Sequence, residues 1–65
     1  MNNIFVKGAL IQNHFQCVFI NLGEVNRTFT KEGKMTVYYK LYNVVTKNTI
    51  ISTDFYMSLT YRVLS

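Results

Sequence analysis

Apolar and polar residues alternate along the second half of the chain, which is the pattern of strands that bury one face. Odd positions are apolar from Met35 to Val45 except for Asn43, and from Ile51 to Val63 except for Thr53. The chain is rich in Val, Ile, Phe, Tyr and Thr, residues that favour strands over helices. The pattern therefore predicts an all-β fold.

Turn-forming residues divide the chain into five segments. The clearest turn lies at Lys31-Glu32-Gly33-Lys34, where glycine supplies the positive φ that a short hairpin loop needs. Gln12-Asn13, Leu22-Gly23 and Lys47-Asn48-Thr49 mark the other turns. We expect a five-stranded antiparallel meander that forms a curled sheet or a small barrel. The expected strands are Asn3 to Ile11, His14 to Asn21, Glu24 to Thr30, Met35 to Val45 and Ile51 to Val63.

The register of the last hairpin follows from its alternation, because a slip of one residue would turn one apolar face to the wrong side. A three-residue loop centred on Asn48 pairs Leu41 with Phe55. A two-residue turn at Lys47-Asn48 would instead place Lys40 opposite Phe55. We therefore prefer the longer loop.

The final segment has an alternative interpretation as a short helix. Phe55, Leu59 and Val63 are spaced four residues apart, which places them on one face of a helix. Ser52 or Thr53 would then cap its first turn. Both interpretations stay open from the sequence.

The first hairpin is expected to be apolar on both faces. A turn at Gln12-Asn13 pairs Leu10 with Phe15, and apolar residues then occupy both sides of the pair. Such a pair is buried on both sides, either by closure of a barrel or by another chain. Gly8 is a candidate bend within the first strand.

Size and composition limit the fold to one small domain spanning residues 1–65. A chain of 65 residues builds a core of marginal size, and its single cysteine, Cys17, forms no internal disulfide. Self-association is the remaining support for so small a core, so we expect a homo-oligomer. With 49% hydrophobic and 15% charged residues, the chain should fold rather than stay disordered.

Location and origin are predicted only in outline. No run approaches the ~20 apolar residues of a membrane span, and no secretory leader is recognisable, so we expect no membrane association. An unpaired cysteine suits a reducing compartment, which predicts a cytoplasmic protein. Abundant Asn, Thr, Ile and Lys without Pro or Trp is typical of an AT-rich genome. A chain this short without enzymatic residues is typical of an accessory protein of a phage or another mobile element.

Residues for catalysis or for holding a cofactor or metal are nearly absent from the sequence. The three carboxylates, Glu24, Glu32 and Asp54, are far apart in sequence and suggest no acid–base pair. His14 and Cys17 are three residues apart, hence on opposite faces of a strand, so they cannot form a nucleophile and base pair. A zinc site would need four ligands, and these two residues supply only two. We therefore expect a protein that is not an enzyme and needs no cofactor.

The even face of the last hairpin gathers tyrosines and cations and is the candidate partner-binding surface. In the preferred register Lys40 lies opposite Tyr56, and Arg62 and Lys34 lie near one end of the hairpin. Tyrosine side chains offer wide contact area at low entropic cost, which suits both protein interfaces and base stacking. Cross-strand tyrosines also simply stabilise sheets, so a purely structural role is the alternative. The predicted partner-binding residues are Tyr38, Lys40, Tyr42, Tyr56 and Arg62.

Three functions remain open. The preferred one is docking onto a protein partner, as an inhibitor or an adaptor. The alternative is binding of single-stranded nucleic acid, in which Arg27 and Lys34 add phosphate contacts; the net charge of +4 favours it, but no dense basic run does. A weaker alternative is a small-ligand pocket between identical subunits.

Overall fold

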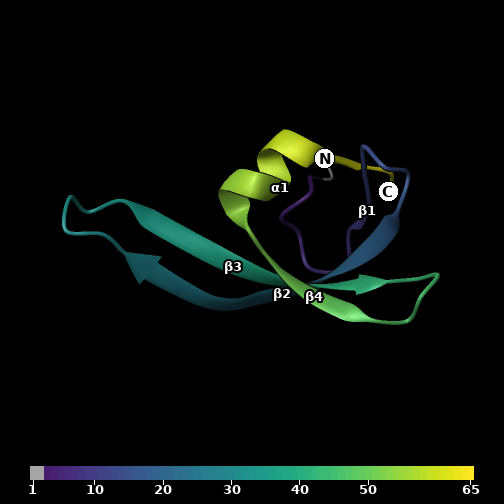
Figure 1. The fold of residues 1–65 in the computed structure, drawn as a ribbon, viewed down its shortest axis with the longest axis horizontal. Coiled ribbons are helices and arrows are strands. Elements are labelled where there is room, and N and C mark those ends of the chain that lie inside the picture. Colours follow the sequence, from purple (N-terminus) through teal and green to yellow (C-terminus); the bar gives the residue numbers. More distant parts are fainter. Residues whose placement is uncertain (1–2) are drawn as a thin grey trace.

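The computed structural model describes residues 3–65 as one five-stranded antiparallel sheet with a short helix near the C-terminus (Figure 1). The mostly-β fold class predicted from the alternation is confirmed. The elements in chain order are β1 (Leu10–Asn13), β2 (Val18–Phe29), β3 (Met35–Asn43), β4 (Thr49–Thr53), α1 (Asp54–Thr60) and β5 (Tyr61–Val63).

The strands are arranged in the order β4-β3-β2-β1-β5. The first four strands form the expected meander, but α1 carries the chain across the sheet so that β5 pairs with β1 at the far edge. In Figure 1, β2, β3 and β4 lie below, whereas α1, β1 and β5 lie above them. The sheet is therefore curled, and the closed-barrel alternative is wrong because β4 and β5 remain separate edges.

The core lies inside this curl, against α1. Strand pairing places the odd-numbered residues of β3 on the inner face, where Leu41 is 0% exposed. Met57 of α1 is also 0% exposed and packs onto this face. The N-terminal segment, residues 3–9, covers the inner face beside the helix through Ile4 and Ala9. The buried cluster consists of Ala9, Ile11, Phe19, Leu41 and Met57.

The second and third predicted strands are one long strand, so the turn predicted at Leu22-Gly23 is wrong. Gly23 has φ of +108°, and the pairing of β2 with β3 shifts register between Asn21 and Glu24. A glycine in a left-handed conformation can form a bulge as readily as a turn. Here it forms a bulge, and the strand continues to Phe29.

The first hairpin has a longer turn than predicted, and its predicted register is wrong. Leu10 pairs with Ile20 rather than with Phe15, and residues 14–17 form the turn. Asn13 stabilises this turn because its Oδ1 accepts hydrogen bonds from the N–H groups of Phe15 (3.0 Å) and Cys17 (2.9 Å). Residues 3–9 are not a strand, and Gly8 lies ahead of β1 rather than at a bend within it.

The register predicted for the last hairpin is also wrong. Leu41 pairs with Ile50, not with Phe55. Asn43 sets the longer turn because its Oδ1 accepts from the N–H groups of Val45 (2.9 Å) and Thr46 (3.1 Å). The local hydrogen bonds of an asparagine side chain thus stabilise a longer turn in place of a tighter one.

The helical alternative for the final segment is confirmed over residues 54–60. Thr53 is the N-cap, because its Oγ1 accepts a hydrogen bond from the N–H of Tyr56 at 3.2 Å. The residue that the helix buries is Met57, whereas Phe55 and Leu59 are 71% and 69% exposed. The helix ends at Thr60, and Val63 belongs to β5.

Candidate binding surface

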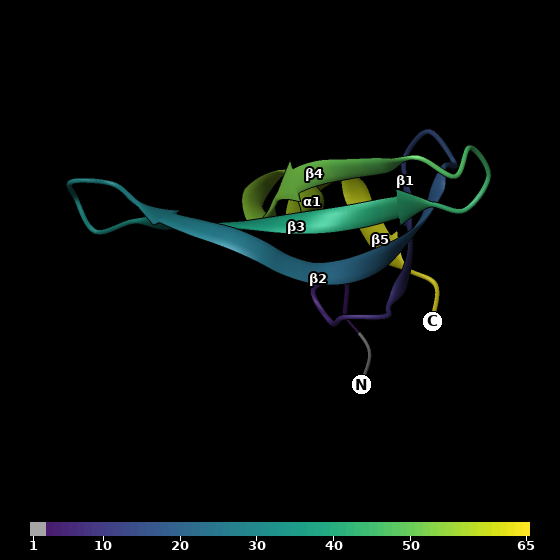
Figure 2. The same ribbon diagram turned by 90° about the horizontal axis from the view of Figure 1, so that it is seen from below.

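The outer face of the sheet, opposite α1, presents the even-numbered residues of β3. Tyr38, Lys40 and Tyr42 lie on this face, two residues apart in sequence. Figure 2 looks onto it, with β2, β3 and β4 in front of α1. The structure therefore brings together three of the five residues predicted for partner binding.

Arg62 lies on the same face of the sheet but at its other edge. It pairs with Gln12 of β1, which in turn pairs with Val18 of β2. Its Nη2 donates a hydrogen bond to Oε1 of Gln12 at 2.7 Å. The strand that carries Arg62, β5, is separated from β3 by β2 and β1 in the strand order, so Arg62 is not an immediate neighbour of the β3 residues.

Tyr56 does not lie on the outer face, so its predicted pairing with Lys40 is wrong. Ile51 occupies the position opposite Lys40. Tyr56 belongs to α1 on the inner side of the sheet, where its ring lies 6.5 Å from the ring of Tyr61, edge to face. The five-residue difference between predicted and observed register separates Tyr56 from the outer tyrosines.

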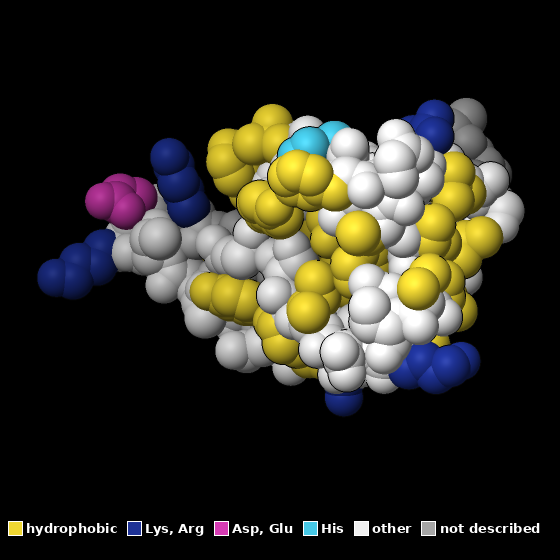
Figure 3. All heavy atoms as spheres, turned by 45° about the vertical axis from the view of Figure 1, so that its right-hand side comes forward, with side chains coloured by type: hydrophobic (Ala, Val, Ile, Leu, Met, Phe, Trp, Pro, Cys, Tyr) yellow, Lys and Arg dark blue, Asp and Glu magenta, His cyan; other side chains and the backbone are white. Residues whose placement is uncertain are grey.

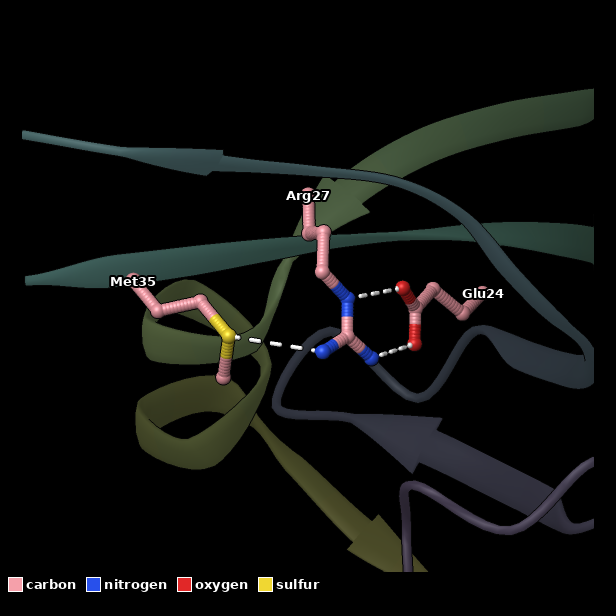
Figure 4. A network of polar contacts seen from close by, with 3 residues as sticks. All are labelled: Glu24, Arg27 and Met35. Atoms are coloured by element: carbon pink, nitrogen blue, oxygen red, sulfur yellow. Dashed lines mark hydrogen bonds and ion pairs between the residues drawn. The ribbon is translucent and has the colours of Figure 1, made fainter.

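Arg27 and Lys34, the predicted phosphate contacts, are also apart from the outer tyrosines. Arg27 pairs with Val37 on the inner face, and its guanidinium forms two 2.6 Å hydrogen bonds with the carboxylate of Glu24 (Figure 4). This contact lowers the pKa of Glu24 and balances the charge of Arg27 within the chain. Lys34 lies in the loop between β2 and β3.

Aliphatic side chains complete the outer face, and the sequence interpretation missed them. Ile20 of β2 pairs with Tyr42, and Ile51 of β4 pairs with Lys40 and is 56% exposed. The even positions of β2 carry the signal, since Val18, Ile20 and Leu22 alternate with the buried Phe19 and Asn21. The outer face is therefore a mixed aromatic and aliphatic surface.

The charges on the outer face are positive. Lys40 and Arg62 carry them. Glu24 lies on the inner face, Glu32 in the β2–β3 loop, and Asp54 at the start of α1. Among the described strands, no carboxylate side chain thus occupies an outer-face position.

A second candidate surface is a groove on the inner side, between α1 and the far part of β2 and β3. We call residues 24–37 the arm, because they project beyond the other strands (Figure 1). The groove has a volume of about 690 Å³. Burial and the carboxylates of Glu24 and Asp54 raise the pKa of Tyr39 at its floor. Its lining residues are Phe5, Thr30, Lys34, Met35, Thr36, Val37, Tyr39, Asp54, Phe55 and Ser58.

Metal-ligating side chains are scattered over the described residues. No three metal-ligating side chains gather within residues 3–65, and His14 and Cys17 both lie exposed in the β1–β2 turn. No helix over the same residues is long and apolar enough to cross a membrane. At the end of the molecule turned away from the arm, hydrophobic side chains reach the surface in several places, with Lys and Arg at its margin (Figure 3).

Comparison of the chain with protein-family models, with curated proteins and with solved structures gave no match.

Proposed function

We propose that this protein is a non-enzymatic binding protein that docks through the outer face of its sheet onto an acidic surface of another protein. By occupying that surface it would act as an inhibitor or an adaptor. The observation that supports this most directly is the uncovered outer face, where Tyr38 and Tyr42 flank Lys40 beside Ile20 and Ile51.

The composition of this face suits a protein interface. Tyr38 and Tyr42 are half-buried on the sheet, so little side-chain freedom remains to be lost on binding. Ile51 is 56% exposed and gains from being covered. Aromatic anchors inside an apolar patch are typical of the residues that contribute most to binding energy.

The charge of the face favours an acidic partner. Lys40 sits among the apolar residues with no carboxylate at the outer-face positions of the described strands, and Arg62 adds a second cation at the edge. A surface of opposite charge would speed encounter and fix the orientation of the complex. Two copies of this same face would instead bring like charges together.

Single-stranded nucleic acid is the second candidate, because the same tyrosines and cations could stack bases and contact phosphates. Two cations neutralise few phosphates, and Arg27 is already paired with Glu24. The aliphatic neighbours, Ile20 and Ile51, add nothing to base stacking. The protein partner is therefore the better-supported proposal.

Affinity capture from a host lysate, with and without nuclease, tests the proposal. Lys40→Glu should weaken capture about tenfold, equivalent to ~1.4 kcal/mol, because it places like charges in contact. Lys7→Glu makes the same charge change on an exposed residue of the N-terminal segment and should leave capture unchanged. Tyr42→Ser should weaken capture with little change in melting temperature.

Direct binding of single-stranded oligonucleotides at low salt separates the two candidates. A protein partner predicts capture that survives nuclease and no binding of oligonucleotides by the purified chain. Binding of oligonucleotides that weakens steeply with salt and is lost in Lys40→Glu would instead support the nucleic-acid function. Nuclease-resistant capture that is equal for Lys40→Glu and Lys7→Glu would exclude the outer face as the docking surface.

A further inference from the structure

The arm is a two-stranded ribbon without lateral support. The strand β1 pairs with β2 only as far as Ile20, and β4 pairs with β3 only from Tyr38 to Tyr42. Within the described residues, β2 beyond Glu24 and β3 before Tyr38 therefore pair only with each other. A two-stranded ribbon alone is marginally stable in water, so contact with another surface would stabilise the arm.

The inner side of the arm is apolar and exposed toward its tip, beyond the Arg27–Glu24 ion pair, and the Nη1 of Arg27 donates a weak hydrogen bond to Sδ of Met35 at 3.6 Å. Phe29 and Met35 face each other across the two strands and are 67% and 46% exposed. On the other wall of the groove, Phe55 of α1 is 71% exposed. Monomeric proteins rarely leave several large apolar side chains uncovered beside one another.

We propose that two copies of the chain form a two-fold symmetric dimer in which the arm of each copy lies in the groove of the other. Phe29 and Met35 of one copy would contact Phe55 of its partner, and the reciprocal contact would follow by symmetry. The dimer goes beyond the docking function proposed above. It leaves both outer faces free, so that the dimer would present two docking surfaces.

The apolar area available is of the right order for a stable dimer. At ~200 Å² for each large side chain, the exposed parts of Phe29, Met35 and Phe55 amount to roughly 350 Å² per copy. A stable interface buries about 800 Å² on each partner. The three side chains would thus supply somewhat less than half, with the polar walls of the groove and the arm backbone supplying the rest.

The charges of the arm and groove are complementary. The tip of the arm carries Lys31 and Lys34 against the single carboxylate of Glu32. Lys34 and Asp54 line the same groove within one copy, and Asp54 forms no ion pair with any described residue. An arm tip placed over the groove of a second copy would bring its lysines toward Asp54. The outer face lacks such self-complementarity, because its charges are Lys40 and Arg62.

Sedimentation equilibrium of the purified chain tests the dimer. We expect twice the 7.6 kDa monomer mass for the wild type. Phe29→Lys or Phe55→Lys should reduce the mass to that of a monomer, since each places a charge in the apolar contact. Phe15→Lys is the matched control, because Phe15 is 70% exposed but lies in the β1–β2 turn. It should remain a dimer.

A mixing experiment tests the reciprocal contact itself. Phe29→Lys and Phe55→Glu should each be monomeric alone, but a mixture should form a heterodimer with one Lys–Glu contact and one native Phe29–Phe55 contact. Both variants change exposed residues, and circular dichroism verifies that each is folded. A monomeric wild type, or a mixture that stays monomeric, would overturn the proposed dimer.

These outcomes are distinct from those of the docking function. Phe29→Lys leaves the outer face intact, so that the monomeric variant should still capture the partner of that face. Lys40→Glu should weaken capture and leave the dimer mass unchanged. If Lys40→Glu instead abolished the dimer while Phe29→Lys did not, the self-association would belong to the outer face and the arm would be excluded.

Discussion

The side chain of Asn21 ties the N-terminal segment to the sheet through Ile4. Its Nδ2 donates to the backbone carbonyl of Ile4 at 2.8 Å, and its Oδ1 accepts from the N–H of Gly23 at 2.8 Å. Asn21 is 0% exposed and sits on the inner face beside the apolar core. A buried amide is stable there because both of its polar atoms have partners.

Replacing Asn21 with alanine should lower the free energy of unfolding by about 2 kcal/mol. The change leaves the carbonyl of Ile4 and the N–H of Gly23 without their partner, and each such loss costs ~1–3 kcal/mol. Urea unfolding measures the effect. Asn26→Ala, at an exposed position on the same strand, should change stability by less than about 0.5 kcal/mol. Equal effects of the two variants would contradict the role assigned to Asn21.

Helix α1 should tolerate replacement of Leu59 by alanine but not replacement of Met57. Met57 is 0% exposed and belongs to the core cluster, so that Met57→Ala should cost about 2–5 kcal/mol and leave much of so small a domain unfolded. Leu59 is 69% exposed, and Leu59→Ala should have little effect on thermal unfolding. Similar losses at the two positions would instead indicate a strand that buries alternate residues, including both Met57 and Leu59.

The N-cap of α1 can be tested at Thr53. Thr53→Ala removes the acceptor for the N–H of Tyr56 and should destabilise the protein by about 1 kcal/mol. Thr53→Ser keeps the hydroxyl and should restore most of that loss. Chemical denaturation of both variants gives the comparison, and a serine variant as unstable as the alanine variant would exclude capping as the cause.

Stability should fall at alkaline pH through Tyr61. Burial raises the pKa of Tyr61 above the ordinary value of 10.0, so that the phenol ionises in the unfolded chain before it ionises in the folded one. The free energy of unfolding should therefore hold steady below about pH 10 and decrease as pH rises toward the folded pKa. Burial raises the pKa of Tyr39 in the same direction.

Tyr61→Phe isolates this effect, because it keeps the ring against Phe19, whose centroid lies 5.6 Å away. The variant should lose stability less steeply above pH 10 than the wild type. Urea unfolding at a series of alkaline pH values makes the measurement. An identical slope for both proteins would show that Tyr61 does not titrate differently on folding.

Element type was predictable from the sequence where local residues decide it. The alternation from Met35 to Val45 gave a strand in the right place, and the Lys31–Lys34 turn is where it was expected. The choice between strand and helix after Thr53 was not predictable, because Phe55, Leu59 and Val63 fit both periods. The contact of Met57 with the core, together with the Thr53 cap, decides it.

The candidate binding surface was predictable only in part, because it depends on register. Tyr38, Lys40 and Tyr42 share a face on any strand, since they are two residues apart. Their neighbours depend on loop lengths, which Asn13 and Asn43 set through side-chain hydrogen bonds. Both turns are longer than predicted because of those bonds. As a result, Ile51 of β4 rather than Tyr56 lies opposite Lys40, and aliphatic side chains share the face.

By itself, the sequence determined that this chain forms antiparallel strands with one apolar side. Tertiary structure alone decided that α1 crosses the sheet and which face it covers. The physical reason is that burial of Met57 and pairing of β5 with β1 involve residues far apart in the chain. Local periodicity carries no information on such contacts. Because these contacts place α1 on the inner side, the outer face and the arm stay uncovered by the described residues.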